Sequence, residues 1–316
     1  MSPVVGSEAR VSVIIPVFGT APFVPAALDS VLAQTYPHYE IVVVNDGSPD
    51  SGLLDQLLQP YLGRIIYLVQ ENRGSSAARN AGIKVARGEY VAILDSDDYW
   101  HPEYLASQLA VFDSDRTIDV VYPDAVRFTS EGKITRQFSK LHPVGGEISF
   151  MRVLSRECEI YGGATARRDT VLRVGLYDEN LRTGEDFDLW LRILKAGGRV
   201  AYNDRVLAYY RERPGSLTSN DTSLITNMLG LLDRLEAKMD LSAEERVAVA
   251  RQRANASAKL ALAEGKAALL AGDRRNAITK LREAFRHARG WKLAAVLFGL
   301  MTVPSLVEWL FRTRNR

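Results

Sequence analysis

Four short apolar runs occur between residues 11 and 94, and helical patterns separate them. The runs cover residues 11–18, 39–46, 64–70 and 90–94. Continuous apolar runs of this length are typical of strands that are buried on both faces, as in parallel sheets. Strands that alternate with helices predict right-handed βαβ crossovers and helices on both faces of the sheet. We therefore expect an α/β fold with a mostly parallel sheet.

Polar or glycine-containing segments lie at the carboxyl ends of these four runs, at residues 16–19, 45–48, 71–75 and 95–98. In open parallel sheets, ligands bind beyond the carboxyl ends of the strands. Four such ends on one edge predict a binding site there. Neither a Walker phosphate loop nor a G-x-G-x-x-G fingerprint follows the first run, so a bound nucleotide would need acidic and polar groups plus a metal.

Three carboxylates, those of Asp95, Asp97 and Asp98, end the fourth run. Carboxylates at the mouth of a buried strand repel one another unless water, donors or a cation compensate them. Oxygen-rich clusters favour hard cations such as Mg²⁺ or Mn²⁺, which commonly bridge a carboxylate and a substrate phosphate. The alternative is a solvated loop in which Asp98 caps the next helix.

A second acidic pair, Glu185 and Asp186, opens a helical pattern over residues 183–195. Its buried stripe is formed by four apolar residues at i, i+3, i+4 and i+7, namely Phe187, Trp190, Leu191 and Leu194. Thr183 and Asp186 have a spacing similar to a capping box. The acids are either favoured there by the helix dipole, or one of them is a general base in the cleft.

The middle of the chain gives weaker signals. Residues 105–146 look irregular, with one candidate strand at 119–122 and a flexible, lid-like segment at 143–146. Gly162 and Gly163 would let a ligand approach the backbone, although a plain bulge or turn explains them as well. Residues 200–210 are expected to form closing strands, followed by a turn-rich segment at 211–216.

Charge is distributed unevenly along the chain. From Arg246 onward there are 15 Lys and Arg against 4 Asp and Glu, a net charge of +11, which leaves 25 against 34, or −9, for residues 1–245. A basic tail suggests an anionic partner, for which a membrane surface and nucleic acid are the candidates. Cys158 is the only cysteine, which excludes an intrachain disulfide and favours a reducing compartment. Residues 1–10 do not resemble a signal peptide and are expected to be a disordered lead-in.

The composition changes to long Ala-, Leu- and Arg-rich helical patterns beyond about residue 221. Residues 268–285 resemble one tetratricopeptide-type hairpin, and a solenoid generally needs about three such units. We therefore expect a helical extension over residues 221–290. Residues 291–316 are apolar and basic, with Trp291 and Trp309 near flanking arginines, which suits an interfacial helix on an anionic bilayer. An amphipathic helix docked on the protein itself is the alternative.

Six motifs together carry a family resemblance. They are VSVIIPVF at 11–18, NDGS at 45–48, GSSAARNAG at 74–82, GEY at 88–90, LDSDDYW at 94–100 and GEDFDLWLR at 184–192. In this order and spacing the chain resembles glycosyltransferase family 2 over residues 11–217. The resemblance implies a GT-A fold in a catalytic domain at 11–220, a nucleotide-sugar donor, a divalent metal (Mg²⁺ or Mn²⁺) and inversion at the anomeric carbon. The Q-x-x-R-W motif of processive members is absent, which favours transfer of one or a few sugars.

The resemblance also implies roles for individual residues. Pro16 and Phe18 would line the nucleotide pocket, with Arg79 near the nucleotide. Asp46 would accept a hydrogen bond from the nucleobase, usually uracil, although Asn45 replaces the more frequent Asp beside it. Asp95 would serve the ribose or a metal-bound water.

The reacting groups follow from the same comparison. Asp97 would hold the metal, together with Asp95. Asp186 would be the general base, with Glu185 beside it. Arg213 stands where the family often has a His near the diphosphate and could neutralise phosphate directly. Gly163 and Trp190 are further candidates for contact with the diphosphate or acceptor.

The resemblance implies a UDP-sugar donor and a glycan, lipid-linked or cell-surface polysaccharide acceptor. We expect no nucleic-acid partner, and a cytoplasmic location that is peripheral on the inner face of the cell membrane. One alternative is a sugar nucleotidyltransferase, which would need a Gly-rich basic loop that residues 18–22 lack. Another is a non-catalytic protein that binds a partner through its basic tail; the presence of both acidic motifs argues against it.

Overall fold

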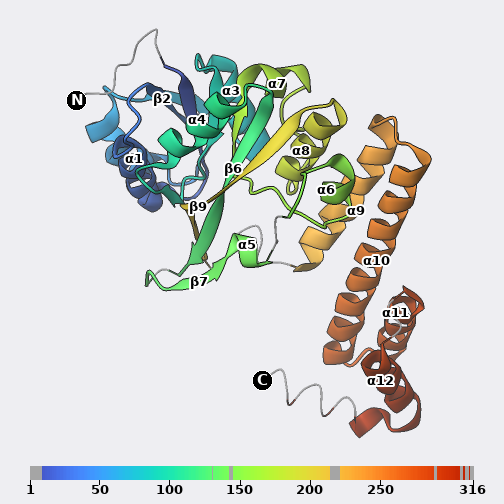
Figure 1. The fold of residues 1–316 in the computed structure, drawn as a ribbon. Helices are drawn as coiled ribbons and strands as arrows, with labels where there is room; N and C mark the ends of the chain where they lie inside the picture. The colour runs from blue at the N-terminus through green and yellow to red at the C-terminus, as the bar shows by residue number, and fades with distance from the viewer. Residues whose placement is uncertain are drawn as a thin grey trace. The chain divides into compact units, whose positions relative to one another are not determined.

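A computed structural model describes residues 9–129, 131–141, 145–213, 221–287 and 290–306, together with Trp309 and Thr313. The chain forms two compact units, Met1–Ser216 and Leu217–Arg316, which are called here the sheet unit and the helical unit (Figure 1). Most of the expected lead-in, part of the lid-like segment and the end of the 211–216 turn lie outside the described residues.

Four parallel strands form one half of the sheet, in the order β3-β2-β1-β4. Their bounds are Val11–Val17 for β1, Tyr39–Asp46 for β2, Ile66–Gln70 for β3 and Tyr90–Ile93 for β4. The predicted parallel arrangement is confirmed for these strands. Because they run in the same direction, their four carboxyl ends lie at one edge of the sheet.

The other half of the sheet is mixed, and its order from β4 onward is β8-β6-β9-β5. These strands are β5 at Tyr99–Trp100, β6 at Ile118–Phe128, β8 at Thr165–Arg167 and β9 at Arg199–Arg211, and β7 at Ile134–Gln137 pairs with β6. Strand β9 is parallel to β6 and antiparallel to β5. The region expected to hold several closing strands is therefore one long strand, which ends near the aspartates that follow β4.

Helices cover both faces of the parallel half. Ile14 and Val44 point at α3, Ser75–Val85, whereas Val13 and Ile15 pack in a core with α1, Val24–Leu32, and α4, Tyr104–Ser114. This alternation follows from the period of two in a strand. Helix α3 lies so close to the sheet that a Cβ on Gly82 would come within 2.4 Å of Ile14 Cγ2.

The remaining helices of the sheet unit are short, except for α8. They are η1 (Ala21–Phe23), α2 (Ser51–Leu58), η2 (Gln59–Tyr61), α5 (Phe138–Leu141), α6 (Phe150–Leu154), α7 (Arg168–Arg173) and α8 (Glu185–Lys195). Helix α4 corrects the prediction that residues 105–146 are irregular. Its buried face includes the polar Gln108, whose amide donates to the Val121 carbonyl, and this polar residue obscures the apolar period.

The helical unit consists of α9 (Asp221–Lys238), α10 (Ala243–Ala271), α11 (Arg274–His287) and α12 (Trp291–Thr302). A capping box between Ser242 and Glu245 starts α10, and Gly272, at φ 83°, ends it. Helices α10, α11 and α12 share a small apolar core. No helix among the described residues combines the length and the apolar character that crossing a membrane requires.

Candidate active site

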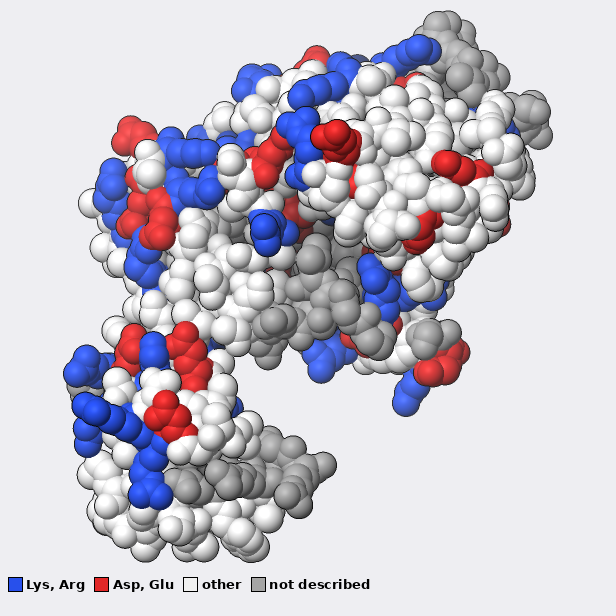
Figure 2. All heavy atoms as spheres, turned by 180° about the vertical axis from the view of Figure 1, so that it is seen from behind, with Lys and Arg blue, Asp and Glu red and all other residues white. Residues whose placement is uncertain are grey.

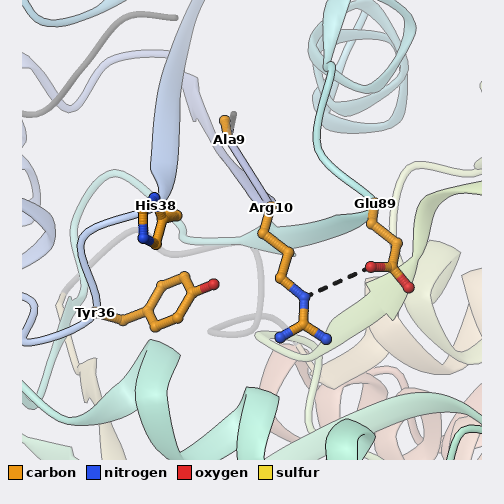
Figure 3. Close-up of a pocket in the computed structure, with 5 residues that line it drawn as sticks. All are labelled: Ala9, Arg10, Tyr36, His38 and Glu89. Carbon is orange, nitrogen blue, oxygen red and sulfur yellow. Dashed lines mark ion pairs between the residues drawn. The ribbon is translucent and has the colours of Figure 1, made fainter. Parts of the chain in front are cut away.

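One shallow pocket of about 470 Å³ lies at the amino ends of β1 and β2, the edge opposite the polar strand ends (Figure 3). Ala9, Arg10, Tyr36, His38 and Glu89 line it. The guanidinium of Arg10 is already paired, because its Nε lies 3.5 Å from a Glu89 carboxylate oxygen and a terminal nitrogen binds Asp113. We therefore place the candidate site at the other edge, where the acidic motifs gather.

The first acidic motif follows β4, and arginines from elsewhere in the sheet unit neutralise it. The carboxylate of Asp95 accepts a hydrogen bond of 2.9 Å from Arg79, which lies on α3. The carboxylate of Asp97 accepts one of 2.5 Å from Nε of Arg213, just beyond β9. The charge compensation expected for the carboxylate cluster thus comes from the chain in this structure.

Asp98 connects the motif to β9. Its Oδ1 accepts 2.8 Å from the backbone N–H of Arg211, whose guanidinium donates to the Asp97 carbonyl and lies over the rings of Phe23 and Phe128. Burial, and then repulsion from Asp95 and Asp97, raise the pKa of Asp98. The alternative that Asp98 caps the next helix is wrong, since α4 starts at Tyr104 after Glu103.

The second acidic motif lies at the start of α8. Gly184, with φ 78°, occupies the N-cap position, one residue after Thr183, so the N-cap residue has no side chain with which to cap the helix. Oδ1 of Asp186 accepts 2.8 Å from the backbone N–H of Phe187. Burial, followed by repulsion from Glu185, raises the pKa of Asp186 to about 6. A carboxylate with this pKa is suited to proton transfer near neutral pH.

Arg79 joins the two acidic motifs. Its guanidinium donates from one nitrogen to Asp95 and from the other to Glu185, and it lies 5.4 Å from the centre of the Tyr177 ring. Ser75 adds a hydrogen bond of 3.2 Å to the same Glu185 oxygen. The Arg79 side chain is only 11% exposed, so its charge is desolvated and matched by the two carboxylates.

The residues expected around the nucleotide lie at the same strand edge. Phe18 is 51% exposed just beyond β1, and Pro16 is half-buried within it. The Asp46 carboxylate accepts hydrogen bonds from the Gln70 amide and from the backbone N–H groups of Arg73 and Gly74, at 2.7, 3.0 and 2.8 Å. It therefore holds the loop before α3, and its contact with a nucleobase stays a prediction.

The glycine pair is arranged differently from our expectation. Gly163 faces the ring of Tyr161, and its carbonyl accepts 2.7 Å from the hydroxyl of Tyr104. Gly162 is the one that faces the site, because a Cβ there would lie 2.6 Å from Oδ2 of Asp186. The doubled glycine signalled a close approach in the sequence, but only the fold shows which glycine makes it.

Trp190 belongs to the protein core. It is 2% exposed, and it lies on the face of α8 that the apolar spacing predicted to be buried. A side chain this buried has no surface to offer an acceptor or a diphosphate.

The acidic residues at the strand edge could supply part of a metal site. Among the described residues, no three His, Cys, Asp or Glu side chains are grouped as a metal site. Asp95 and Asp97 nevertheless present carboxylates at the strand edge, and Mg²⁺ is commonly bound by one or two carboxylates plus substrate phosphates. The donor set therefore fits a metal shared with a substrate, not a cage made by the protein alone.

Comparison with known proteins places this arrangement in a family. The sequence pattern of "Glycosyl transferase family 2" matches residues 12–173, just over half of the chain. The putative teichuronic acid biosynthesis glycosyltransferase TuaG of Bacillus subtilis is 32% identical over 215 residues, which cover 66% of this chain and 82% of TuaG. An uncharacterized glycosyltransferase of Rickettsia felis is 33% identical, over 58% of this chain but 31% of its own length, so the chain spans about a third of that relative.

Two solved structures share the fold. TarS 1–349 of S. aureus in complex with UDP-GlcNAc aligns with a TM-score of 0.63 and 21% identity, over 88% of this chain and 91% of that one. The mannosyltransferase PcManGT of Pyrobaculum calidifontis, in complex with GDP-Man and Mn²⁺, aligns with a TM-score of 0.59 and 19% identity, over 96% and 83%. These likenesses support the GT-A fold that the sheet displays. The chain belongs to glycosyl transferase family 2, a family of transferase enzymes.

Proposed function

We propose that the sheet unit, with a catalytic domain at residues 11–220, transfers a sugar from a nucleotide-sugar to an acceptor hydroxyl with inversion at the anomeric carbon. The observation that carries the proposal is the second acidic motif. Asp186 is half-buried, has a pKa raised to about 6, and follows Glu185, which Arg79 links to Asp95. The proposed proton acceptor thus lies next to the glutamate that Arg79 links to the first acidic motif, which supports one shared site.

The reaction needs one proton acceptor and one stabilised leaving group. The acceptor oxygen attacks the anomeric carbon and forms the new C–O bond, while its proton passes to the carboxylate of Asp186. The bond between the anomeric carbon and the phosphate oxygen breaks, and its electron pair leaves with the nucleoside diphosphate. Attack from the face opposite the leaving group inverts the configuration.

The leaving diphosphate carries negative charge that cations must compensate. Asp97 and Asp95 would hold a divalent metal, which when bound supplies Lewis-acid stabilisation to the diphosphate. Arg213 lies beside Asp97 and would offer its guanidinium to a phosphate oxygen. The PcManGT complex with GDP-Man and Mn²⁺ supports this assignment by similarity of fold.

The donor class is proposed from the same similarity. TarS has been solved with UDP-GlcNAc and with UDP, and PcManGT with GDP-Man, so a UDP-sugar is the first candidate and a GDP-sugar the second. The putative role of TuaG in teichuronic acid biosynthesis favours a glycan or lipid-linked acceptor. We expect transfer of one or a few sugars per acceptor.

A panel of nucleotide-sugars tests the proposal. UDP-GlcNAc, UDP-glucose and GDP-mannose are each incubated with the protein with and without Mn²⁺, and the released nucleoside diphosphate and the melting temperature are measured. We expect one donor to be hydrolysed in a Mn²⁺-dependent manner and to raise the melting temperature. A protein that neither hydrolyses nor is stabilised by any nucleotide-sugar in the panel contradicts the proposal.

We also propose that α12 rests on an anionic membrane surface. Trp291 and Phe298 are 78% and 66% exposed on the side of α12 that faces away from the core of the helical unit, and Met301 is exposed beside them. Lys292 lies 5.9 Å from the Trp291 ring, and Arg282 of α11 contacts the Met301 sulfur at 3.3 Å. Exposed aromatic and apolar side chains flanked by cations suit the interface of an anionic bilayer.

Charge on the helical unit supports the same partner. Figure 2 shows Lys and Arg side chains, interspersed with Asp and Glu, on one part of this unit, next to an uncharged surface. Such an arrangement combines apolar burial with electrostatic attraction to anionic lipid, each of which is weak alone.

Vesicle flotation tests the membrane proposal. We expect recovery with phosphatidylglycerol-containing vesicles but not with phosphatidylcholine alone, and loss of recovery in the Trp291→Ser/Phe298→Ser variant. Val247→Ser, which changes an exposed apolar residue of α10, is the matched control and should float like the wild type. Equal recovery of the double variant, or association of copies of the chain without lipid, contradicts the proposal.

A further inference from the structure

We propose that Arg79 is a positioning residue that holds the two acidic motifs at a fixed separation. By binding Glu185, it would also fix the position of the neighbouring Asp186. The proposal rests on the proposed function, because it assigns Asp186 the role of base. It replaces the expectation that Arg79 binds the nucleotide. The sequence resemblance places Arg79 near the nucleotide, whereas the fold bonds its guanidinium to the carboxylates of Asp95 and Glu185.

The guanidinium of Arg79 is bonded to two carboxylates. One terminal nitrogen of Arg79 donates to Asp95 and the other to Glu185, and the Tyr177 ring covers the group. Its Nε is buried and has no hydrogen-bond partner among the described residues. Each terminal nitrogen is thus already bonded to a carboxylate, and a phosphate that took the place of either one would separate the largely desolvated Arg79 charge from a partner.

Hydrogen bonds from α3 fix the segments around Arg79. Asn80, the next residue on α3, donates 2.9 Å to the Tyr177 carbonyl and accepts 2.9 Å from the Tyr177 N–H. Ser75, one turn earlier on α3, donates to Glu185. Helix α3 therefore grips the segment that leads into α8 at two points on either side of Arg79. Side chains that are fixed by such hydrogen bonds hold the site geometry more precisely than side chains on unsupported loops.

Charged groups of both signs surround the Asp186 carboxylate. Among the described residues, Glu185 on α8 and Asp95 after β4 are negative, Arg79 on α3 is positive, and the phenol of Tyr177 and the N–H of Phe187 also lie near the carboxylate. A positive and a negative neighbour favour opposite protonation states of the same carboxylate. Removal of Arg79 and removal of the Glu185 charge should therefore displace the titration of Asp186 in opposite directions.

The test compares Arg79→Gln, Arg79→Lys and Glu185→Gln with the wild type. The pH profile of kcat/KM is measured with the donor that the panel identifies, and the dissociation constant of UDP with Mn²⁺ is measured separately. We expect the acidic limb to move up by about one pH unit in Arg79→Gln and down in Glu185→Gln. Arg79→Lys should keep the limb in place but lower kcat, since lysine keeps the charge and loses the two-pronged contact.

Binding distinguishes a positioning role from direct contact with the nucleotide. We expect the dissociation constant of UDP with Mn²⁺ to change by less than about threefold in all three variants. A loss of UDP affinity of about tenfold or more in Arg79→Gln and Arg79→Lys, or limbs that move in the same direction in Arg79→Gln and Glu185→Gln, overturns the inference. If Arg79→Gln does not fold, the near-isosteric Glu185→Gln and Arg79→Lys decide by the same readouts.

The proposed function fails in a different way. If Asp186→Asn were active, Asp186 could not be the base and the proposed function would fail. If only the inference about Arg79 were wrong, Asp186→Asn would still be inactive, and the unexpected results would come from the Arg79 and Glu185 variants alone.

Discussion

The backbone of Gly162 lies against the carboxylate of Asp186, so that a Cβ on Gly162 would come within 2.6 Å of Oδ2. Gly162→Ala should therefore displace the carboxylate by a few tenths of an ångström or more. Because small displacements of a reacting group slow catalysis strongly, we expect turnover to fall by about 10- to 100-fold with UDP binding unchanged. Steady-state kinetics and calorimetric titration measure the two effects.

The matched control for this change is Gly52→Ala. Gly52 lies in α2 and has no atom within 4 Å of a built Cβ, so alanine should raise stability slightly and leave turnover unchanged. Turnover of Gly162→Ala within twofold of the wild type would contradict the close approach.

The pH dependence of the wild-type enzyme follows from the same carboxylate. Burial and the neighbouring Glu185 raise the pKa of Asp186 from 3.8 to about 6. A base acts in its deprotonated form, so kcat/KM should be level above this pH and fall about tenfold per unit below it. A profile that stays level down to about pH 4.5 would show that no group with this pKa accepts the proton.

Metal-dependent donor binding should depend on Asp97. Asp97→Asn removes the charge at the acidic motif, so the increase in melting temperature caused by UDP with Mn²⁺ should be lost. Asp113→Asn, at the far edge beside Arg10, is the control and should keep that increase. Equal stabilisation of the Asp97 variant and the wild type would exclude Asp97 from the metal site.

Two helical glycines in the helical unit should respond oppositely to alanine. A Cβ on Gly265 of α10 would lie 2.8 Å from Leu281 Cγ on α11, whereas Gly230 of α9 has open space around it. We expect Gly265→Ala to lower the free energy of unfolding by about 1–3 kcal/mol and Gly230→Ala to raise it by about 0.5–1 kcal/mol. Thermal unfolding followed by circular dichroism checks both, and equal shifts would contradict the packing of α10 on α11.

The parallel half of the sheet was predictable because local sequence determines it. Apolar runs with polar ends mark β1 to β4, and the edge on which their ends meet follows from the alternation with helices. Strand β8 was not predicted, because it has only three residues and its pairing partners are distant in sequence. Helix α4 was not predicted, because a buried glutamine interrupts its apolar face.

The acidic residues of the site were identifiable from sequence, but their partners were not. The motifs locate Asp95, Asp97 and Asp186 on the chain, whereas the hydrogen bonds from Arg79 to Asp95 and Glu185 exist only once α3 packs beside α8. Asp46 shows the same limit. Its carboxylate holds a loop that begins 24 residues later, at Gln70, and nothing local in the sequence indicates that contact.

The proposed mechanism requires Asp186 to act as the base. The most direct measurement is the turnover of Asp186→Asn with the donor found in the panel, together with its affinity for UDP in the presence of Mn²⁺. We predict a loss of turnover of about 10²- to 10⁴-fold with UDP affinity close to that of the wild type. Turnover within a fewfold of the wild type would contradict the assignment of the base and the mechanism built on it.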